Sequence, residues 1–442
     1  MNIQFIQAIS MEGIDVECVY PIGLVTLASI IKRETKHQLS LFDMNIADDP
    51  YGQLKEILST YSTDLICISL RNIDPLGNKT SSLIPAFAVT LAFIKKLCPK
   101  TKIMAGGTGF TLFARQLMEE YPEIDFGIIG EAENNIIPLL DNLENPPDLA
   151  GICYRKAGQI IINPPIGDFD MQNYQMPDRN LLDPKAYLER NHYVECIGVE
   201  SKRGCNLTCG YCAYPDLSGS KLRCRNPIEI VDEIEYLKKN YGISQIHFTD
   251  SVVNTPLDHF NAVCQELIKR DLNISWSGFF RENLLTEENV RLYADSGCQC
   301  FSLSPDGLTQ NSLDQLNKHM KVDDILNAAR ILAKCGVVTV YHFLVNTPGA
   351  TCQTVDEAKK LIDQLFSIHE FSKTLGTIVL NNIRILPGTA IEKQALDNKV
   401  IDEHTDLLYP TYYNPQPYDK LRYELEIYHQ KKNIFTWQEV PQ

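Results

Sequence analysis

Three cysteines share one short stretch of this chain, Cys205, Cys209 and Cys212, in a Cys-x3-Cys-x2-Cys spacing. At this spacing a single loop can place three thiolates around an iron–sulfur cluster, whose usual protein ligands are thiolates. Three ligands to a four-iron cluster leave one iron open to another molecule. Gly204 and Gly210 allow the backbone to curl closely around such a cluster, because glycine has no Cβ atom. The stretch therefore predicts a [4Fe-4S] cluster with one open iron.

Zinc binding and simple burial are the less favoured roles for these cysteines. Structural zinc takes four ligands, often as two Cys-x2-Cys or Cys/His pairs. No second pair follows at such a spacing, and Cys224 stands alone. Three inert buried thiols would seldom show this spacing next to Arg203-Gly204 and with Tyr211 before the last cysteine. The cluster is the favoured interpretation.

The motif Cys-x3-Cys-x-aromatic-Cys, matched here by Cys205, Cys209, Tyr211 and Cys212, resembles that of the radical S-adenosylmethionine (SAM) superfamily. The resemblance implies that the amino and carboxylate groups of SAM chelate the open iron, with Tyr211 at this cofactor site. It also implies cleavage of SAM to a 5′-deoxyadenosyl radical by an electron from the cluster. An external donor of the flavodoxin or ferredoxin type would supply that electron.

The length of 442 residues predicts two or three domains, and the 44% hydrophobic and 22% charged content is that of an ordinary globular protein. We expect no membrane-spanning helix and no signal peptide, because no long apolar run is found and the chain does not start with one. The cluster motif needs reduced thiols, so we expect a cytoplasmic location for this chain of 14 cysteines.

The net charge of −15 argues against binding to nucleic acid or to an anionic membrane. A basic run surrounds the cluster motif: Lys202, Arg203, Lys221, Arg223 and Arg225. It could serve an anionic substrate or the SAM carboxylate, or it could simply be solvated. The expected partner is therefore a substrate, and neither nucleic acid nor a membrane.

Residues 1–145 alternate short apolar runs with segments of helical length. The expected strands are 3–6, 39–42, 65–70, 102–105 and 126–129, and the expected helices are 22–35, 51–60, 82–97, 110–120 and 132–143. This alternation predicts a parallel sheet covered on both faces, as in a Rossmann-like doubly wound α/β domain. The ligand of such a domain binds at the carboxyl ends of the strands.

The loops at those strand ends supply the candidate cofactor-binding residues of this domain. They are Ser69, Leu70, Arg71 and Asn72 after the third strand, Gly106, Gly107, Thr108 and Gly109 after the fourth, and Gly130 and Glu131 after the fifth. The Gly-Gly-Thr-Gly turn would let a ligand approach the backbone, although it could be only a tight turn. The first strand is not followed by the Gly-x-Gly-x-x-Gly fingerprint of dinucleotide-binding domains.

This pattern resembles the cobalamin-binding domain that precedes a class of radical SAM enzymes. The matching features are the run Tyr20-Pro21-Ile22-Gly23-Leu24, the Gly-Gly turn, and Gly130-Glu131. The Asp-x-His-x-x-Gly motif, whose histidine coordinates the lower face of cobalt in some cobalamin domains, is missing. The resemblance therefore implies cobalamin bound without a lower histidine ligand.

Arg71 is the candidate catalytic residue of this domain. The run Ser69–Asn72 resembles that of radical SAM tryptophan 2-C-methyltransferases, which keep an arginine beneath the cobalamin. A guanidinium has donors but no lone pair to offer a metal, so Arg71 would favour low-coordinate Co(I). The alternative is a weak surface pair between Arg71 and Asp74.

Methylthiotransferases are a rival family, because they also place an α/β domain with three cluster cysteines before the radical domain. Cys18, Cys67 and Cys98 give the right number. However, Cys67 falls within an apolar strand, where a buried thiol is the default. The chain also shows no evident basic tail for RNA, so this interpretation is disfavoured.

Residues 146–193 are rich in Pro, Asn and Asp and predict a linker, in which 151–162 forms a small hairpin between domains. From 194 to 395 the alternation of strand and helix resumes. Expected strands are 195–200, 245–248, 274–278, 300–303, 338–343 and 378–380, which fit the partial (β/α)6 barrel of the radical SAM core. Residues 396–442, with Tyr409, Tyr412, Tyr413 and Tyr418, are expected to cap the barrel.

Site residues of such barrels lie at the carboxyl ends of the strands. The resemblance implies that Asp250 receives the amino group of SAM, that Arg281 pairs with its carboxylate, and that Ser304 and Asp306 bind its ribose. Asn346-Thr347-Pro348-Gly349 is similar to the family's Gly-x-Pro-Gly turn, with a departure at its first two residues. Each of these residues could instead serve as an ordinary cap or turn.

The function that these resemblances imply is methyl transfer from SAM, by way of methylcobalamin, to an unactivated carbon or phosphorus. The substrate would be a small molecule or a peptide-derived compound. A second hypothesis keeps both cofactors but performs a non-methylating oxidation, cyclisation or rearrangement. A third is a redox or sensor protein that binds the cluster and cobalamin without turnover.

Overall fold

The computed structural model describes residues 1–10, 18–60, 62–75, 80–146, 148–165, 169–191, 194–415, 419–432 and 435–436. Tyr418 of the expected capping segment lies outside these residues. The chain forms two compact units, Met1–Leu76 with Ser81–Gly198, and Gly77–Thr80 with Val199–Gln442.

The first unit is built on a seven-stranded sheet with the strand order β2-β1-β3-β4-β5-β6-β7. Its strands are β1 (Asn2–Gln7), β2 (Gln38–Asp43), β3 (Leu65–Ser69), β4 (Lys102–Gly106), β5 (Phe126–Ile128), β6 (Ile152–Lys156) and β7 (Gln159–Ile162). The strands from β1 to β5 pair in parallel. The order reverses between β1 and β3, and ligands of doubly wound sheets bind outside the carboxyl ends of the strands at such a point.

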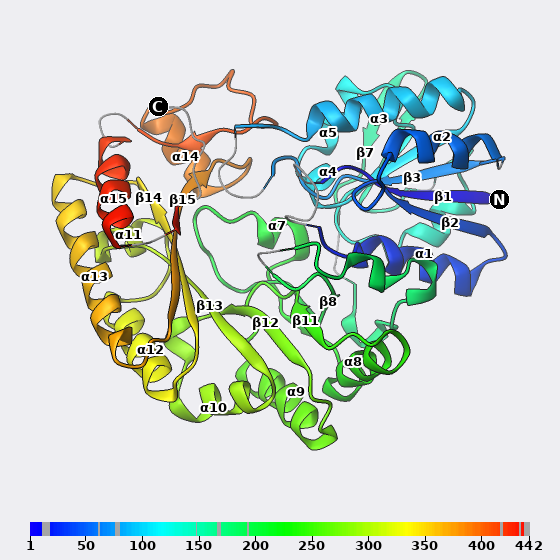
Figure 1. Ribbon diagram of the computed structural model, residues 1–442. Coiled ribbons are helices and arrows are strands. Elements are labelled where there is room, and N and C mark those ends of the chain that lie inside the picture. Colours follow the sequence, from blue (N-terminus) through cyan, green and yellow to red (C-terminus); the bar gives the residue numbers. More distant parts are fainter. Residues whose placement is uncertain are drawn as a thin grey trace. The chain divides into compact units, whose positions relative to one another are not determined.

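Helices cover both faces of this sheet, with α1 on one face and α2, α3 and α5 on the other (Figure 1). The helices are α1 (Ile22–Glu34), α2 (Pro50–Thr60), α3 (Ile84–Leu97), α4 (Thr108–Leu112), α5 (Ala114–Glu120) and α6 (Ile136–Leu140). On the α1 face, Leu24 and Ile31 pack with Phe5 of β1 and Ile136 of α6 in one buried cluster. The predicted doubly wound α/β fold is confirmed.

The segment expected to be a linker is instead part of the first unit. Strands β6 and β7 extend the sheet as an antiparallel hairpin. Three short 3-10 turns follow, η1 (Met171–Asn173), η2 (Arg179–Leu181) and η3 (Pro184–Tyr187). Asp178 ties this segment to α1 through Ser29 and, at 2.7 Å, Lys32. Pro and Asn do make turns here, but Tyr174 and Tyr187 between them are buried.

The second unit contains an eight-stranded sheet with the order β16-β15-β14-β13-β12-β11-β8 and β17 beside β15. Its strands are β8 (Gly198–Val199), β11 (Gln245–Phe248), β12 (Ser275–Phe280), β13 (Cys298–Asp306), β14 (Thr339–Val345), β15 (Leu375–Arg384), β16 (Tyr412–Tyr413) and β17 (Phe435–Thr436). The pairs from β11 to β15 are parallel. A separate ribbon joins β9 (Lys202–Arg203) to β10 (Arg223–Cys224).

Helices lie on the outer side of this curved sheet, as in the predicted partial barrel (Figure 1). They are α8 (Pro227–Tyr241), α9 (Leu257–Arg270), α10 (Glu287–Asp295), α12 (Val322–Cys335) and α13 (Cys352–Glu370). The unit also contains α7 (Tyr214–Ser218), α11 (Gln310–Gln315), α14 (Ala390–Asp397), α15 (Asp419–Lys432) and the 3-10 turn η4 (Glu282–Leu284). Helix α8 begins after Asn226, which caps it by accepting a hydrogen bond from the backbone N–H of Ile228. Among the described residues, no helix combines the length and apolar character needed to cross a bilayer.

An aromatic core joins the sheet to these helices. Trp276 is fully buried and contacts Phe248, Phe260 and Tyr293 edge to face. Side chains alternate along a strand, so a register that turns Trp276 toward the helices turns the alternate residues toward the barrel interior. By the same alternation, the side chain of Arg281, directly after β12, faces the barrel interior.

Candidate functional site

The three cysteines lie in the loop between the two strands of the β9–β10 ribbon. Cys205 is buried, and Cys209 and Cys212 are half-buried. Gly204, at φ +86°, begins the loop in the left-handed region, and a Cβ atom there would collide with the carbonyl oxygen of Lys221. Only glycine fits this turn without strain. The ribbon's own backbone, at Lys221, therefore requires glycine at position 204.

The three thiols are close enough to influence one another electrostatically. Burial raises the pKa of Cys212 to about 11, and the charges of Cys209 and Cys205 contribute to that rise. The backbone N–H of Tyr214 donates to Cys212 Sγ at 3.4 Å. In the described residues, no three His, Cys, Asp or Glu side chains converge on a single metal ion. A four-iron cluster does not need such convergence, because each cysteine binds a different iron, and the loop fits this group.

A second loop, between α11 and α12, clamps the cysteine loop. The backbone N–H of Gly210 donates to Leu316 O at 2.9 Å, and Asn317 Nδ2 donates to Thr208 O at 2.7 Å. His319 Nε2 lies 3.1 Å from the hydroxyl of Thr208. This loop was not predicted from the sequence. Its only signal was the polar run Asn317-Lys318-His319, which does not lie at a strand end.

Tyr211 of the cysteine motif is anchored by Asp306, to which its hydroxyl donates a hydrogen bond. Lys318 Nζ lies 2.6 Å from Asp306 Oδ2 and donates to Ser304 O at 2.9 Å. The structure thus brings the predicted residues Tyr211, Ser304 and Asp306 together at the end of β13. Burial raises the pKa of Cys209, whereas the charges of Lys318 and Arg281 lower it. Two cations therefore stand near this thiol.

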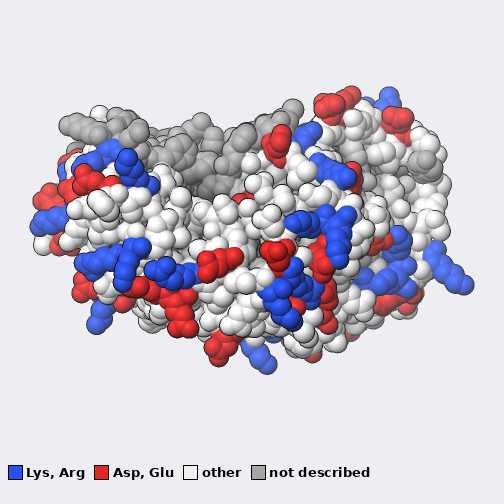
Figure 2. All heavy atoms as spheres, turned by 60° about the horizontal axis from the view of Figure 1, so that its bottom comes forward, with Lys and Arg blue, Asp and Glu red and all other residues white. Residues whose placement is uncertain are grey.

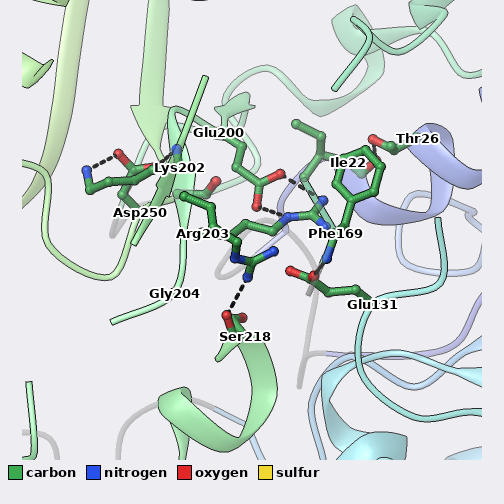
Figure 3. Close-up of polar contacts among 12 residues, drawn as sticks. Ile22, Thr26, Glu131, Phe169, Glu200, Lys202, Arg203, Gly204, Ser218 and Asp250 are labelled. Carbon is green, nitrogen blue, oxygen red and sulfur yellow. Dashed lines mark hydrogen bonds and ion pairs between the residues drawn. The ribbon is translucent and has the colours of Figure 1, made fainter. Parts of the chain in front are cut away.

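Asp250 is held by the residues that lead into the cysteine loop. Its side chain is fully buried, and Oδ1 accepts from the backbone of Ser201 and Lys202 at 2.9 and 3.3 Å. Its Oδ2 accepts from the Ser201 hydroxyl and, at 2.7 Å, from Lys202 Nζ. A carboxylate has about four acceptor sites, and Ser201 and Lys202 donate four hydrogen bonds to this one; Figure 3 shows Lys202 beside Asp250. These contacts make Asp250 an anchor for β9, and its expected contact with the SAM amino group stays a prediction.

Arg281 is largely buried at the end of β12, where its guanidinium donates to the backbone of Lys318 and, at 3.3 Å, of His319. Glu282 follows it and is 2% exposed. Burial raises the pKa of Glu282 to about 7, against the charge of Lys318. Glu282 was not predicted, since a glutamate in a Leu-rich stretch carries no distinctive signal.

The basic run around the cysteines is mostly used in internal contacts. Arg203 makes two hydrogen bonds with Glu200 at 2.9 and 3.0 Å (Figure 3). Arg225 Nη1 lies 2.9 Å from Glu233, and both side chains are buried. Lys202 pairs with Asp250 as described. The run is therefore neither a fully solvated surface nor mainly a substrate-binding patch, and Lys221 is its exposed member.

In the first unit, the glycine turn after β4 packs directly against the loop after β3. The backbone N–H of Gly109 donates to Leu70 O and Arg71 O, and the Thr108 hydroxyl donates to Arg71 O at 2.6 Å. A Cβ atom on Gly107, at φ +99°, would lie 2.6 Å from Leu70 O. The predicted residues Leu70–Asn72 and Gly106–Gly109 therefore form one continuous edge at the carboxyl ends of β3 and β4.

The residues after β5 make local contacts of their own. The backbone N–H of Gly130 donates to the Thr111 hydroxyl at 3.0 Å. Glu131 accepts from the backbone of Phe169 at 2.7 Å, which ties the following segment to the sheet (Figure 3). This contact gives Glu131 a structural use.

Arg71 is half-buried at the switch point of the sheet. Burial raises the pKa of Cys18 to about 12, and the charge of Arg71 acts in the opposite direction. Of the first unit's described histidines, His37 lies at the other end of the strands, 3.2 Å from the amino group of Met1. His192 lies outside the described residues. This edge therefore has the guanidinium of Arg71 and, among the described residues, no histidine side chain. The arrangement fits a cobalamin bound without a lower histidine ligand.

Comparison with known proteins matches both units. Residues 16–138 match the family model of the B12 binding domain, and residues 199–362 match that of the Radical SAM superfamily. The chain is 26% identical over 353 residues to the anaerobic magnesium-protoporphyrin IX monomethyl ester cyclase of Rubrivivax gelatinosus, covering 77% of this chain and 61% of the cyclase. The chain thus spans about three fifths of that relative's length.

Two further relatives are methyltransferases by description. An uncharacterised methyltransferase of Pyrococcus horikoshii is 23% identical over 387 residues, covering 86% of this chain and 79% of that protein. The radical SAM methyltransferase TsrM from Kitasatospora setae, solved with cobalamin and a [4Fe-4S] cluster, has a TM-score of 0.76 at 19% identity. The superposition covers 90% of this chain and 78% of TsrM, and at this identity it shows a common fold.

Proposed function

This chain is a radical SAM protein with a B12-binding domain, and from that premise we propose that it is a cobalamin-dependent methyltransferase. The two domains imply a [4Fe-4S] cluster, SAM and cobalamin as cofactors. When bound, the cluster with SAM supplies radical chemistry, and cobalamin supplies a carrier for the methyl group. The acceptor that we propose is an unactivated carbon or phosphorus of a small molecule or peptide-derived compound.

The observation that carries the proposal is the cysteine loop. Hydrogen bonds hold it to the loop between α11 and α12 and to Asp306, and buried cations lie beside it. Cys205, Cys209 and Cys212 would hold the cluster. Lys318 and Arg281 would offset the negative charge of the thiolates, because opposite charges at close range in a buried site stabilise one another. Tyr211, Arg281, Ser304 and Asp306, gathered at the ends of β12 and β13, are the residues that we propose for the SAM site.

In the first unit, the edge formed by Ser69–Asn72 and Gly106–Gly109, with Gly130, is the proposed contact surface for cobalamin. An edge with several glycines suits a large planar ring, because the glycines place no side chain between the ring and the strand ends. Arg71 would lie beneath the cobalamin, where its guanidinium has no lone pair to coordinate the cobalt. Glu131 would act indirectly, by holding the segment at Phe169.

The partners that we propose are the substrate and an external electron donor of the flavodoxin or ferredoxin type, in a reducing cytoplasm. In the part of the chain that the structure describes, the cysteines form no disulfide, which supports such a compartment. On the face drawn in Figure 2, positive and negative side chains are interspersed, which together with the net charge of −15 supports the proposal of no nucleic-acid partner.

The test is an incubation of reconstituted, reduced protein with cobalamin and SAM carrying an isotope-labelled methyl group. Methyl transfer predicts labelled methylcobalamin and S-adenosylhomocysteine even before the acceptor is known. The cyclase relative favours a second candidate, a non-methylating radical reaction. That reaction predicts 5′-deoxyadenosine without any label on cobalamin. A sensor without turnover predicts neither product.

A further inference from the structure

Residues 316–319, in the loop between α11 and α12, hold the cysteine loop through side-chain contacts with Thr208. Asn317 Nδ2 donates to the backbone oxygen of Thr208 at 2.7 Å and to its hydroxyl at 2.8 Å. The same hydroxyl lies 3.1 Å from Nε2 of His319. Thr208 directly precedes Cys209 in the sequence, so these three contacts fix the backbone next to a proposed cluster ligand.

The 316–319 segment also contacts the ends of two barrel strands. The guanidinium of Arg281, directly after β12, donates to the backbone oxygens of Lys318 and His319. Lys318 Nζ lies 2.6 Å from Oδ2 of Asp306, at the end of β13. Arg281 and Asp306 are two of the residues that we propose for the SAM site. One short segment therefore connects this part of the site to the cysteine loop.

Two residues of the segment have an uncommon backbone conformation. Asn317 has a φ of +53° and His319 a φ of +50°, which is the left-handed region that residues other than glycine seldom adopt. Such conformations persist where the surrounding structure determines them, and they gather at functional sites. Here the cysteine loop, Arg281 and Asp306 hold the segment from three sides. The segment is thus kept in one shape at a cost in backbone energy.

The proposed SAM site needs its two parts at a fixed separation. SAM would bind the open iron at the cysteine loop and pair its carboxylate with Arg281. A ligand that contacts two parts of a site binds well only when both are held within about 0.5 Å of the productive geometry. The bonds between Asn317 and Thr208 join these two parts, although neither residue is proposed to touch SAM.

We propose that Asn317 and Thr208 are positioning residues, which fix the cysteine loop relative to Arg281 and thereby set the affinity for SAM. The inference rests on the proposed function, since it concerns the same SAM site. It assigns the two left-handed residues of the 316–319 segment a role in cofactor binding. It also separates this role from cluster retention, which depends on the three cysteines themselves.

The test is equilibrium dialysis of SAM against the full chain with its cluster reconstituted. Thr208→Val keeps the shape of the side chain but removes the hydroxyl, and it should raise the Kd of SAM about fivefold, as expected for one lost hydrogen bond. Asn317→Gly removes both donors and leaves a residue that adopts a positive φ without strain. It should raise the Kd about tenfold.

Electron paramagnetic resonance of the reduced cluster gives a second measurement. Binding of SAM at the open iron changes the surroundings of the cluster, so the spectrum of the wild type should change when SAM is added. Both variants should show the same SAM-free spectrum intensity as the wild type. They should need a higher SAM concentration for half of the change, in proportion to the Kd from dialysis.

Two matched controls and one double variant make the result specific. Thr208→Ser keeps the hydroxyl and should bind SAM like the wild type. Asn273→Gly replaces an asparagine with a φ of +45° at an exposed position of the same unit, and it should also leave the Kd unchanged. In an Asn317→Gly background, Thr208→Val should weaken binding by less than it does alone, because one partner of the hydroxyl is already missing.

An unchanged Kd in cluster-loaded Thr208→Val and Asn317→Gly would overturn the inference. An equal loss of affinity in Thr208→Ser and Thr208→Val would also overturn it. If both Thr208→Val and Asn317→Gly lost the cluster, the bonds would serve only to retain it, and the inference would be wrong. A wild-type chain that holds no four-iron cluster or binds no SAM would instead contradict the proposed function, so the two failures are distinguishable.

Discussion

Lys318 and Asp306 form a buried ion pair with 2.6 Å between Nζ and Oδ2, directly beside the loop of the three cysteines. Asp306 also accepts the hydroxyl of Tyr211, the aromatic residue within the cysteine motif. The pair therefore connects the loop after α11 to the end of β13 and to the cysteine loop. Burial alone would lower the pKa of Lys318, but Asp306 and other negative groups raise it above its ordinary value.

Replacing Lys318 by methionine should destabilise the second unit and lower the reduction potential of the cluster. The unpaired Asp306 would remain buried, which typically costs about 3–5 kcal/mol. Loss of a nearby cation disfavours the more negative, reduced cluster. Thermal unfolding and a redox titration followed by electron paramagnetic resonance measure the two effects.

Lys334→Met is the control for Lys318→Met, because Lys334 pairs with Glu287 at an exposed position. It should change stability by less than about 1 kcal/mol. If Lys318→Met had the same stability and the same cluster reduction potential as Lys334→Met, the pair would have no influence on the cluster.

Asp250→Asn tests whether Asp250 anchors β9 or binds SAM. The anchor role predicts a loss of about 3–5 kcal/mol in unfolding free energy, because Lys202 would stay buried without its counter-charge. It also predicts less iron bound per chain after reconstitution. A variant with normal stability and iron content but weaker SAM binding in equilibrium dialysis would restore the role expected from the family.

Gly107→Ala should destabilise the first unit, because the new Cβ atom would lie 2.6 Å from Leu70 O at a φ of +99°. We expect a cost of about 1–3 kcal/mol, the range for a residue held in a sparsely populated backbone region. Cobalamin affinity should fall with it, since the turn supports Leu70 and Arg71. Gly23→Ala in α1 is the matched control, because its Cβ would meet nothing within 4 Å. Equal unfolding curves for the two variants would contradict the packing argument.

Stability should fall as the pH decreases from about 6.5 toward 4. Burial lowers the pKa of His369 to about 4, so the folded chain keeps this ring neutral while the unfolded chain takes up a proton. Stability is thus complete above the unfolded pKa of about 6.5 and is lost as the pH falls below it. His369→Gln should flatten this dependence in urea unfolding at pH 7 and pH 5. An unchanged difference between the two pH values would exclude His369 as its source.

The sequence predicted the elements whose evidence is local. The cysteine motif, the alternation of strands and helices, and the residues at strand ends all follow from spacing and periodicity. The partners of those residues could not be predicted, because they come from distant segments. The donors to Asp250 lie 48 and 49 positions away at Lys202 and Ser201, and Lys318 lies between two helices.

The segment 146–193 shows the same limit in another form. Its prolines and asparagines correctly indicated turns, and the structure has several short 3-10 helices there. Turn composition, however, says nothing about what lies between the turns. Tyr187 is fully buried and donates a hydrogen bond to Asp43, 144 positions earlier. Only the fold brings these two residues together.

The most direct test of the cluster and cobalamin assignments is the absorbance and electron paramagnetic resonance spectrum of two reconstituted proteins, the wild type and the triple variant Cys205→Ala, Cys209→Ala, Cys212→Ala. We predict a four-iron cluster and bound cobalamin in the wild type. The triple variant should lose the cluster signal and keep the cobalamin, because the two cofactors belong to different units. A four-iron spectrum that persists in the triple variant would contradict these assignments.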